Sequence, residues 1–217
     1  YPVQAAEESE RPVLDEVLYA IVREAATPAE ADAAFARMKS AFFDWNEIRV
    51  STIPEVTAVL EPVADAGGKA VRLVEFLQEH FERTYSFSLD GLEKKGLKDA
   101  AKQLARYKNH GVNDFALAWV TQRTLGGHAV PLDEPSLRVL RRLGAIDGDE
   151  EDLSAVRSSV EHYVPKVKGP EFTDLLIQHA STLCVEGTPD CGHCPLKSDC
   201  PTGQEVLSKP KPKPKSR

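Results

Sequence analysis

Cysteine is scarce in this 217-residue chain: there are four, and all lie between residues 184 and 200. Long apolar runs are absent too, and no stretch approaches the roughly 20 apolar residues that a membrane-spanning helix needs. No signal peptide is visible, although the chain starts at Tyr1 rather than methionine, so a preceding segment and its targeting information stay open. The cytoplasm is the expected location, and clustered cysteines there indicate metal ligands rather than disulfides.

Signals for β-strand pairing are also missing, because β-branched residues are scattered and no two-residue hairpin turn stands between apolar runs. Apolar residues instead recur at three- and four-residue spacing, which predicts helices. The predicted helices cover residues 14–25, 29–42, 53–63, 69–81, 97–107, 114–125, 135–143, 153–163 and 171–183. The fold class is therefore all-α, and an apolar content of 41% is enough for a core.

Positive charge is in the minority, and the formal net charge of −7 argues mildly against a polyanionic partner. The charge is segregated along the chain, however. Between residues 94 and 110 a single acid, Asp99, accompanies six bases: Lys94, Lys95, Lys98, Lys102, Arg106 and Lys108. Such a run is either a solvated helix face or the local basic patch that phosphate contacts need.

The four cysteines follow the spacing C-x6-C-x2-C-x5-C, from Cys184 through Cys191 and Cys194 to Cys200. A structural zinc site usually has two close pairs separated by a longer loop, whereas here only the middle two cysteines are close. One compact loop of four thiolates suits a cubane iron–sulfur cluster, in which each thiolate binds one iron. Zinc and a redox-active thiol cluster remain the alternatives.

Residues 104–120 contain two helical runs on either side of a short turn, residues 109–113. Gly111 and Asn113 both tolerate a left-handed backbone, and such a turn can direct amide N–H groups of the second helix toward a phosphate. An ordinary helical hairpin is the alternative interpretation. Asp133 follows, just before the helix predicted at residues 135–143, where it can serve as an N-cap ahead of Pro135.

The cysteine spacing, the hairpin and the following aspartate resemble the endonuclease III family of helix-hairpin-helix DNA glycosylases. The resemblance covers about residues 13–200 and implies two helical lobes flanking a DNA-binding cleft. A six-helix barrel is expected over residues 13–128, with the helix-hairpin-helix at about 104–120, and an iron–sulfur cluster lobe over residues 129–203. Residues 1–12 are an N-terminal segment that could belong to the second lobe, and residues 204–217 are expected to form a disordered basic tail.

The resemblance also implies roles for single residues. The four cysteines hold a [4Fe–4S] cluster, and Asp133 is the catalytic carboxylate, which stabilises the sugar cation as the base departs or activates the attacking nucleophile. The expected DNA contacts are the hairpin residues and one arginine in a loop between two early helices: Lys108, His110, Gly111, Val112, Asn113 and Arg49. The expected pocket residues are Phe115, His128 and Glu24.

The sequence departs from the family at several of these positions. Phe115 stands where bifunctional members carry the lysine that forms a Schiff base, so lyase activity is not expected. The family's Gly-apolar-Gly turn is Gly111-Val112-Asn113 here. The early glutamate that protonates the leaving base in adenine glycosylases has no clear counterpart, and Glu24 is a weak substitute about one turn away.

These observations predict a monofunctional DNA glycosylase of base excision repair, a monomer associated with the nucleoid. It would bind double-stranded DNA, flip out a damaged or mismatched base and cleave its N-glycosidic bond. Two alternatives stay open. One is a DNA-binding protein with weak or no catalysis that recognises distorted or abasic DNA, and the other is a DNA binder whose affinity responds to the cluster's redox state.

Overall fold

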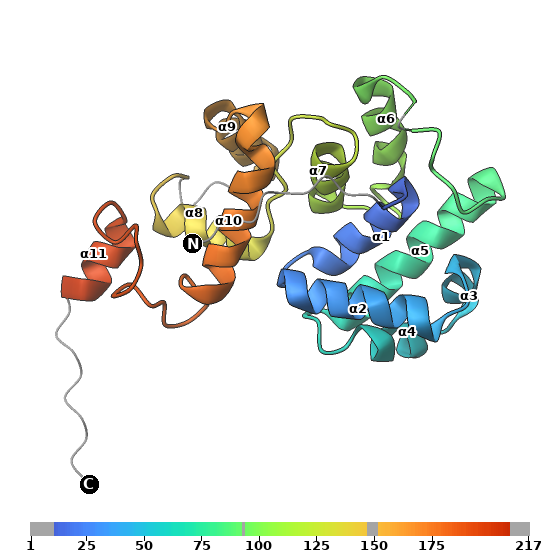
Figure 1. Ribbon diagram of the computed structural model, residues 1–217, viewed down its shortest axis with the longest axis horizontal. Coiled ribbons are helices and arrows are strands. Elements are labelled where there is room, and N and C mark those ends of the chain that lie inside the picture. The colour runs from blue at the N-terminus through green and yellow to red at the C-terminus, as the bar shows by residue number, and fades with distance from the viewer. Residues whose placement is uncertain (1–10, 93, 147–151, 209–217) are drawn as a thin grey trace, which may run out of the picture.

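The computed structural model describes residues 11–92, 94–146 and 152–208, and within them it contains eleven α-helices and no β-strand (Figure 1). The predicted all-α fold class is confirmed. The helices are α1 (Val13–Arg23), α2 (Pro28–Ala41), α3 (Trp45–Val50), α4 (Ile53–Leu60), α5 (Ala66–Thr84), α6 (Leu97–Leu104), α7 (Asp114–Arg123), α8 (Glu134–Arg142), α9 (Leu153–Tyr163), α10 (Gly169–Thr182) and α11 (Pro201–Ser208). Two 3-10 turns, at Ala105–Tyr107 and Lys166–Lys168, join α6 to the hairpin turn and α9 to α10.

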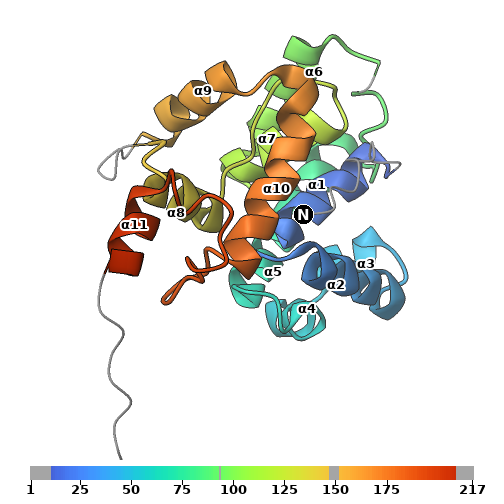
Figure 2. The same cartoon turned by 60° about the vertical axis from the view of Figure 1, so that its left-hand side comes forward.

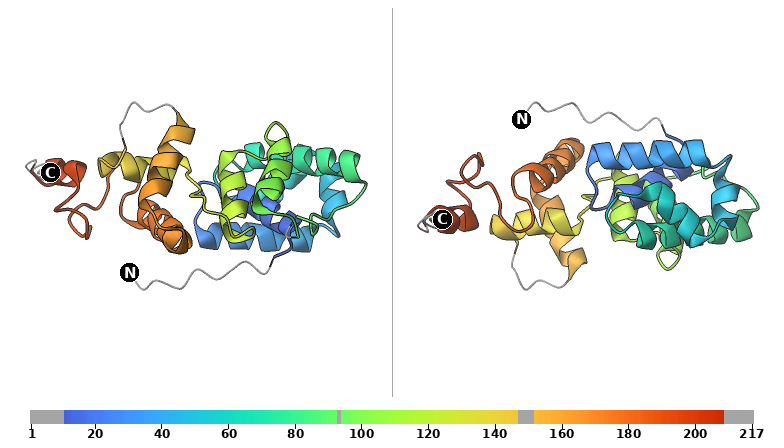
Figure 3. Two further views of the ribbon diagram at one scale, coloured as in Figure 1. Left: turned by 90° about the horizontal axis from the view of Figure 1, so that it is seen from above. Right: turned by 90° about the horizontal axis from the view of Figure 1, so that it is seen from below.

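The helices gather into two groups along the long axis of the molecule, as the views from above and below show (Figure 3). Helices α1 to α7 form the first lobe, and α8 to α11 form the second. Each lobe has its own apolar core: the first draws on residues from Val13 to Val120 with Ile177 from α10, and the second on residues from Val130 to Ala180. The domain boundary predicted between residues 128 and 129 falls between these cores and stays a prediction.

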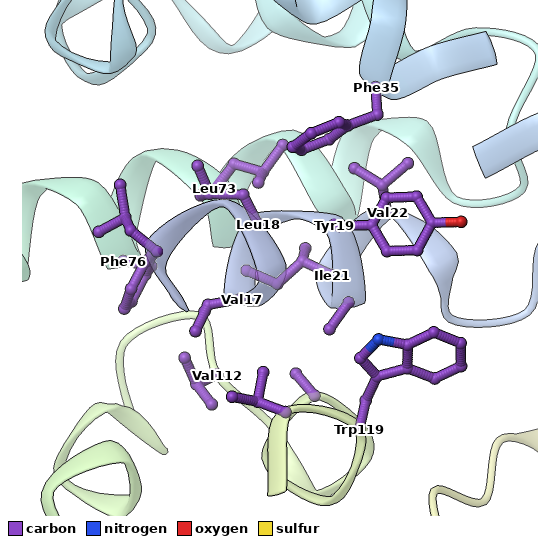
Figure 4. Close-up of a cluster of buried hydrophobic side chains, with 14 of the residues drawn as sticks. Val17, Leu18, Tyr19, Ile21, Val22, Phe35, Leu73, Phe76, Val112 and Trp119 are labelled. Atoms are coloured by element: carbon purple, nitrogen blue, oxygen red, sulfur yellow. The ribbon is translucent and has the colours of Figure 1, made fainter. Parts of the chain in front are cut away.

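Helix α1 lies at the centre of the first lobe and is buried along its whole length (Figure 4). It packs against α2, α5 and α7, so it has no face for water, as expected for a helix enclosed by a bundle. Its buried acids are therefore paired. Asp15 accepts a hydrogen bond from the indole of Trp45 at 2.9 Å, and Glu16 accepts one from the indole of Trp119 at 2.6 Å.

Two helices, α3 and α11, are missing from the sequence-based prediction because they bury too little to show an apolar period. Ile48 is the buried residue of α3, and Gly203 is that of α11. Local capping starts α3 instead, with the Asp44 carboxylate accepting from the Glu47 N–H at 2.8 Å. The tail predicted to be disordered from residue 204 is helical as far as Ser208, so that boundary is wrong.

The second lobe is built on the packing of α8 against α10, with α11 at its outer end (Figure 2). Residues 209–217 of the predicted tail and residues 1–10 of the predicted N-terminal segment lie outside the described residues. Within the described ranges, no helix combines the length and apolar character needed to cross a bilayer.

Candidate functional site

The hairpin between α6 and α7 requires a glycine at its tip. Gly111 has a φ of +84°, and a Cβ there would lie 2.1 Å from the backbone oxygen of Arg72 in α5. Val112 is buried beneath the turn, and its N–H donates to the Tyr107 oxygen at 3.2 Å. The turn is thus pressed directly onto α5.

Asn113 differs from the sequence-based expectation. Its φ is −99°, which is extended rather than left-handed, because the residue is the N-cap of α7. The side-chain oxygen accepts from the Ala116 N–H at 3.0 Å. Asparagine at this position therefore starts the second hairpin helix, and its tolerance of a positive φ is not used.

Asn113 also belongs to a polar cluster that fixes the hairpin to α1 and α5, here called the hairpin latch and made of Glu24, Arg72 and Asn113. The Asn113 side-chain nitrogen lies 2.8 Å from both carboxylate oxygens of Glu24. Arg72 donates to Glu24 at 2.5 Å and to the Gly111 oxygen at 2.9 Å. Charge-assisted hydrogen bonds of this kind are strong. Glu24, predicted as a pocket residue, has both oxygens engaged in the latch.

The other predicted DNA contacts on the first lobe have partners within the protein. Lys108 forms an ion pair with Asp114, and His110 lies 3.6 Å from a carboxylate oxygen of Glu79. Arg49 lies on helix α3 rather than in the predicted loop, and it donates to Asn46 and Gln78. Two bases of α6 and one of the 3-10 turn that follows it are exposed beside the hairpin, so this surface keeps a positive face: Lys98, Lys102 and Arg106.

Asp133 joins the two lobes. It is 5% exposed and is the N-cap of α8, with one carboxylate oxygen accepting from the Ser136 N–H at 2.9 Å. The other oxygen accepts from the Ala25 N–H at 2.9 Å, across 108 positions of sequence. Both oxygens are thus held by backbone donors, one from each lobe. Ala25 follows Glu24 of the latch, so adjacent residues tie the hairpin and the aspartate to the end of α1.

The backbone at Ala25 is itself fixed from below by a buried lysine. Ala25 has a φ of +53°, and the amine of Lys69 donates to the Val22 oxygen at 2.9 Å and to the Glu24 oxygen at 2.6 Å. Burial lowers the pKa of Lys69 to about 8. The sequence did not identify Lys69 and Arg72 as functional candidates, because in α5 they look like ordinary polar residues of an amphipathic helix.

The two remaining pocket candidates do not share a pocket with Asp133. Phe115 is 2% exposed and stacks on Trp119 with ring centres 5.9 Å apart, so it is part of the first lobe's core. His128 is exposed, and its Nε2 lies 2.8 Å from the Glu161 oxygen of α9. Asp133 itself is buried, whereas Ala25, whose N–H it accepts, is exposed, so the carboxylate lies just beneath the surface.

The four cysteines lie together in the second lobe as free thiols. All four line one small cavity of about 20 Å³. The other lining residues lie in or next to α8, α10 and α11 and in the loop itself: Arg142, Leu143, His179, Leu183, Pro189, Asp190, Thr202 and Gly203. The Cys184 sulfur is 3.5 Å from an Arg142 nitrogen, and the Cys194 sulfur is 3.7 Å from His179 Nε2. The loop predicted to gather the four thiols therefore does so.

The chemistry of this cavity fits a cationic occupant. Burial raises the pKa of the Cys191 thiol, and the three neighbouring sulfurs raise it further, as expected when several would-be thiolates share a site. Among the described side chains, no group of three or more His, Cys, Asp or Glu is arranged to hold a single metal ion. Four sulfur donors around a shared cavity match the ligand set of an iron–sulfur cluster.

The molecule therefore has two lobes, each with its own core, with a glycine-tipped helical hairpin on the first and a four-cysteine loop on the second. The fold is that of endonuclease III: a non-covalent endonuclease III–DNA complex superposes with a TM-score of 0.73 at 17% identity, covering 96% of this chain and 91% of that one. No protein-family model matches the sequence.

Two curated relatives agree with the fold. An endonuclease III homolog of Encephalitozoon cuniculi (strain GB-M1) is 27% identical over 114 residues, 51% of this chain and 45% of that protein. An adenine DNA glycosylase of Arabidopsis thaliana is 25% identical over 109 residues, 49% of this chain and 17% of that protein. The matches span less than half of each relative. By fold and by sequence, this chain is similar to endonuclease III.

Proposed function

We propose that the protein is a DNA glycosylase of base excision repair that acts on duplex DNA. The observation that carries the proposal is the position of Asp133, a carboxylate fixed by backbone donors of both lobes where they meet. The names of the relatives support the same class of activity. The hairpin and the exposed bases of α6 supply the expected phosphate contacts, from backbone N–H groups and from positive charge.

The proposed reaction is hydrolysis of the N-glycosidic bond of a flipped nucleotide. As the bond from C1′ to the base breaks, its electron pair leaves with the base and the sugar becomes cationic. The Asp133 carboxylate stabilises that charge electrostatically, or it accepts a proton from the water whose oxygen bonds to C1′. The products are a free base that has gained a proton and an abasic sugar.

We propose that the enzyme is monofunctional. A Schiff base needs a primary amine at C1′, and the position that aligns with the family lysine is Phe115, which cannot attack. The Lys69 amine is committed to two carbonyl oxygens of α1, and the Lys108 amine pairs with Asp114. Neither amine is positioned to replace the missing lysine.

We further propose that Cys184, Cys191, Cys194 and Cys200 hold a [4Fe–4S] cluster. The shared cavity and the all-sulfur donor set support it. When bound, the cluster supplies positive iron centres that cross-link the loop, a structural role like that of other cysteine-bound metals. Arg138 and Arg142 hold the same loop by donating to the Cys184 and Val185 oxygens, at 3.1 and 2.7 Å. Iron and sulfide analysis of the anaerobically purified protein separates the cluster from zinc.

The test of the enzymatic proposal is an excision assay on duplexes that each contain one damaged or mismatched base, with and without hot alkali. A monofunctional glycosylase leaves an abasic site, so strand breaks should appear only after alkali. Breaks without alkali would reveal a nucleophile other than those considered above. No product on a broad panel would exclude the glycosylase.

A second candidate function is a DNA binder without catalysis, and the burial of the site favours it. Asp133, Phe115 and Trp119 are each at most 5% exposed, so a base can reach the carboxylate only after side chains move. Such a binder should retain tight, salt-dependent affinity for abasic or distorted duplexes and give no product. Detectable turnover of any lesion eliminates this candidate.

A further inference from the structure

Arg23, the last residue of α1, is buried in the first lobe with an unused hydrogen-bond donor. It is 1% exposed and is among the largest fully buried side chains of the described chain. Its Nη1 donates to the Ala26 oxygen. Its Nη2 is also buried, and within the described residues it has no hydrogen-bond partner.

The surroundings of Arg23 belong to the candidate site. Its guanidinium carbon lies 5.6 Å from the centre of the Trp119 ring, and Ala25, two residues further on, donates to Asp133. Burial lowers the pKa of Arg23, while the nearby charges of Asp133 and Asp174 act in the opposite direction. The unused donor therefore belongs to a buried side chain two residues from the backbone N–H that holds Asp133, and the charge of Asp133 acts on its guanidinium.

A buried donor without a partner lowers the stability of the folded state. Replacing a buried charged group by an apolar one of similar volume is often neutral or stabilising, so folding alone does not explain an arginine here. Nearly all buried polar groups in proteins have partners. Nη2 of Arg23 is one of nine buried side-chain atoms without one in the described chain, and what sets it apart is its place two residues from the N–H that holds Asp133. An acceptor supplied by a ligand accounts for the free Nη2.

We propose that Arg23 reads the extruded base by donating its free Nη2 N–H to a carbonyl oxygen, which selects 4-keto pyrimidines and 6-keto purines. This inference rests on the proposed glycosylase function and deepens it. The sugar of the flipped nucleotide must lie at Asp133. The edge of the base that reaches past Asp133 into the lobe is then the edge far from the sugar, which carries position 4 of a pyrimidine or position 6 of a purine.

The donor-only chemistry of arginine decides the class of base. A guanidinium has five N–H donors and no acceptor. The keto oxygen of uracil, thymine, guanine or hypoxanthine satisfies it, whereas the amino group of cytosine or adenine would place donor against donor. Sites built around a buried hydrogen bond reject analogues that cannot make it far more strongly than apolar pockets do.

The base must displace packed side chains to reach Arg23, and the new hydrogen bond offsets part of that cost. Trp119 is fixed at its far end by the hydrogen bond from its indole to Glu16, so its ring keeps its place beside the guanidinium. A base entering next to the Trp119 ring would also gain a stacking surface.

The test compares affinities for duplexes that differ by one exocyclic group. Each duplex carries a 2′-fluoro nucleotide that resists cleavage, with uracil or cytosine in one pair and hypoxanthine or adenine in the other, opposite an abasic position. Wild type should bind the keto member of each pair at least about tenfold more tightly, equivalent to about 1.4 kcal/mol. Arg23→Met should reduce the ratio to near one. Arg23→Gln adds an acceptor and should shift the ratio toward the amino bases.

Arg37→Met is the matched control, because Arg37 is an arginine of α2 whose donors are engaged by the Val59, Leu60 and Glu61 oxygens. It should keep the wild-type ratio. A wild-type protein that prefers amino bases or has no preference overturns the proposal, as does either Arg23 variant with an unchanged ratio. Far-UV circular dichroism shows which variants fold. If Arg23→Met does not fold, the affinity ratio of Arg23→Gln becomes the test.

Failure of this inference can be told apart from failure of the proposed function. Affinity for uncleavable duplexes reports on Arg23 whether or not excision occurs. If wild type excises a base but binds keto and amino bases equally well, the role of Arg23 is contradicted and the glycosylase activity is supported. Keto-selective binding without excision of any natural lesion would support the role of Arg23 in reading the base and contradict the proposed glycosylase activity.

Discussion

The two lobes are held together by different means. The first lobe encloses a helix buried on all sides, and its apolar core draws on side chains from α1 to α7. The second lobe has a small apolar core, and beyond residue 184 the buried positions in the described chain are Cys191, Cys200 and Gly203. The first lobe has a core of the kind that the hydrophobic effect stabilises, whereas the cysteine loop has almost none.

The polar contacts follow the same division. In the first lobe, buried polar groups mostly pair with one another around α1, as Asp15 and Glu16 do with the two indoles. In the second lobe, Arg138 and Arg142 hold the cysteine loop through its backbone oxygens. A segment with few apolar contacts and little regular structure needs another source of order. If the proposed cluster is lost, the first lobe should therefore keep its fold, whereas the second lobe should not.

Loss of the cluster should have the largest effect and should divide the molecule. Cys191→Ala removes a ligand, so the loop, and with it α11, should lose protection from hydrogen exchange, and the packing of α8 against α10 should weaken. Helices α1, α2, α5 and α7 should keep their protection, because their core is independent. Hydrogen exchange followed by mass spectrometry measures this by segment.

Ser198→Ala is the control for that experiment, because Ser198 lies in the same loop and its hydroxyl contacts exposed Asp199. It should leave both lobes protected and the iron content unchanged. If Cys191→Ala loosened both lobes equally, the two cores would be one cooperative unit and the comparison would be broken.

Asp133→Asn should have the next largest effect, on chemistry rather than on either core. Loss of the negative charge should lower kcat/KM for excision by about 10²-fold or more, the range seen when one stabilising group is removed from a transition state. An amide also places a nitrogen against one of the two N–H donors, Ala25 or Ser136, which should lower the free energy of unfolding by about 1 kcal/mol.

Asp152→Ala separates the two effects, because asparagine there would keep the one oxygen that accepts both bonds. Asp152 caps α9 and accepts from two backbone N–H groups, those of Ser154 and Ala155, at an exposed position. It should lose about as much cap energy and keep full activity. Equal excision by Asp133→Asn and wild type would remove Asp133 from the mechanism.

Asn113→Ala should have a smaller effect, confined to the first lobe. It removes the cap of α7 and the hydrogen bonds to Glu24, so the free energy of unfolding should fall by about 1–2 kcal/mol. Asn109→Ala is the matched control, because Asn109 is an exposed asparagine of the same turn and should change stability by less than about 0.5 kcal/mol. Urea unfolding measures both. Similar losses would mean that the latch contributes no stability.

The same division explains what the sequence could predict. Helices with buried apolar stripes show a period in the sequence, and the nine predicted helices each correspond to an observed helix within a few residues at most ends. Helices α3 and α11 lack such a stripe and were missed. The four thiols could be grouped from spacing alone, because chain connectivity keeps 17 residues together, but that they hold a cluster stays a prediction.

The site residues were harder to predict, because their roles depend on contacts between distant segments. Glu24 meets Asn113 across 89 positions, and Ala25 meets Asp133 across 108. Arg23 ends an amphipathic-looking segment and would be placed at the surface by type. The helix that ends at Arg23 is amphipathic in sequence, and only the packing of the first lobe shows that its charged side is buried as well.

A pH-dependent effect concerns Lys69 and tests how dry the first lobe is beneath the site. Its folded pKa is about 8, against a usual value near 10.5 in the unfolded chain. Below about pH 8 both states carry the proton, and the cost of burying the charge is present in full. Between about pH 8 and pH 10 the folded state releases the proton while the unfolded state keeps it, so stability should rise with pH.

The neutral amine still has two N–H groups, which match the two carbonyl oxygens of Val22 and Glu24, so deprotonation need not break the contacts that fix Ala25. Burial raises the pKa of Tyr19, so above about pH 10 the unfolded chain releases this proton while the folded protein keeps it. Stability should therefore fall above about pH 10, which limits the expected rise to lower pH. Lys69→Met should flatten the rise in stability measured by urea unfolding at constant ionic strength. Parallel pH profiles for the variant and wild type would mean that water reaches the amine in the folded protein, and that the first lobe is less closed at its site than the contacts around Asp133 imply.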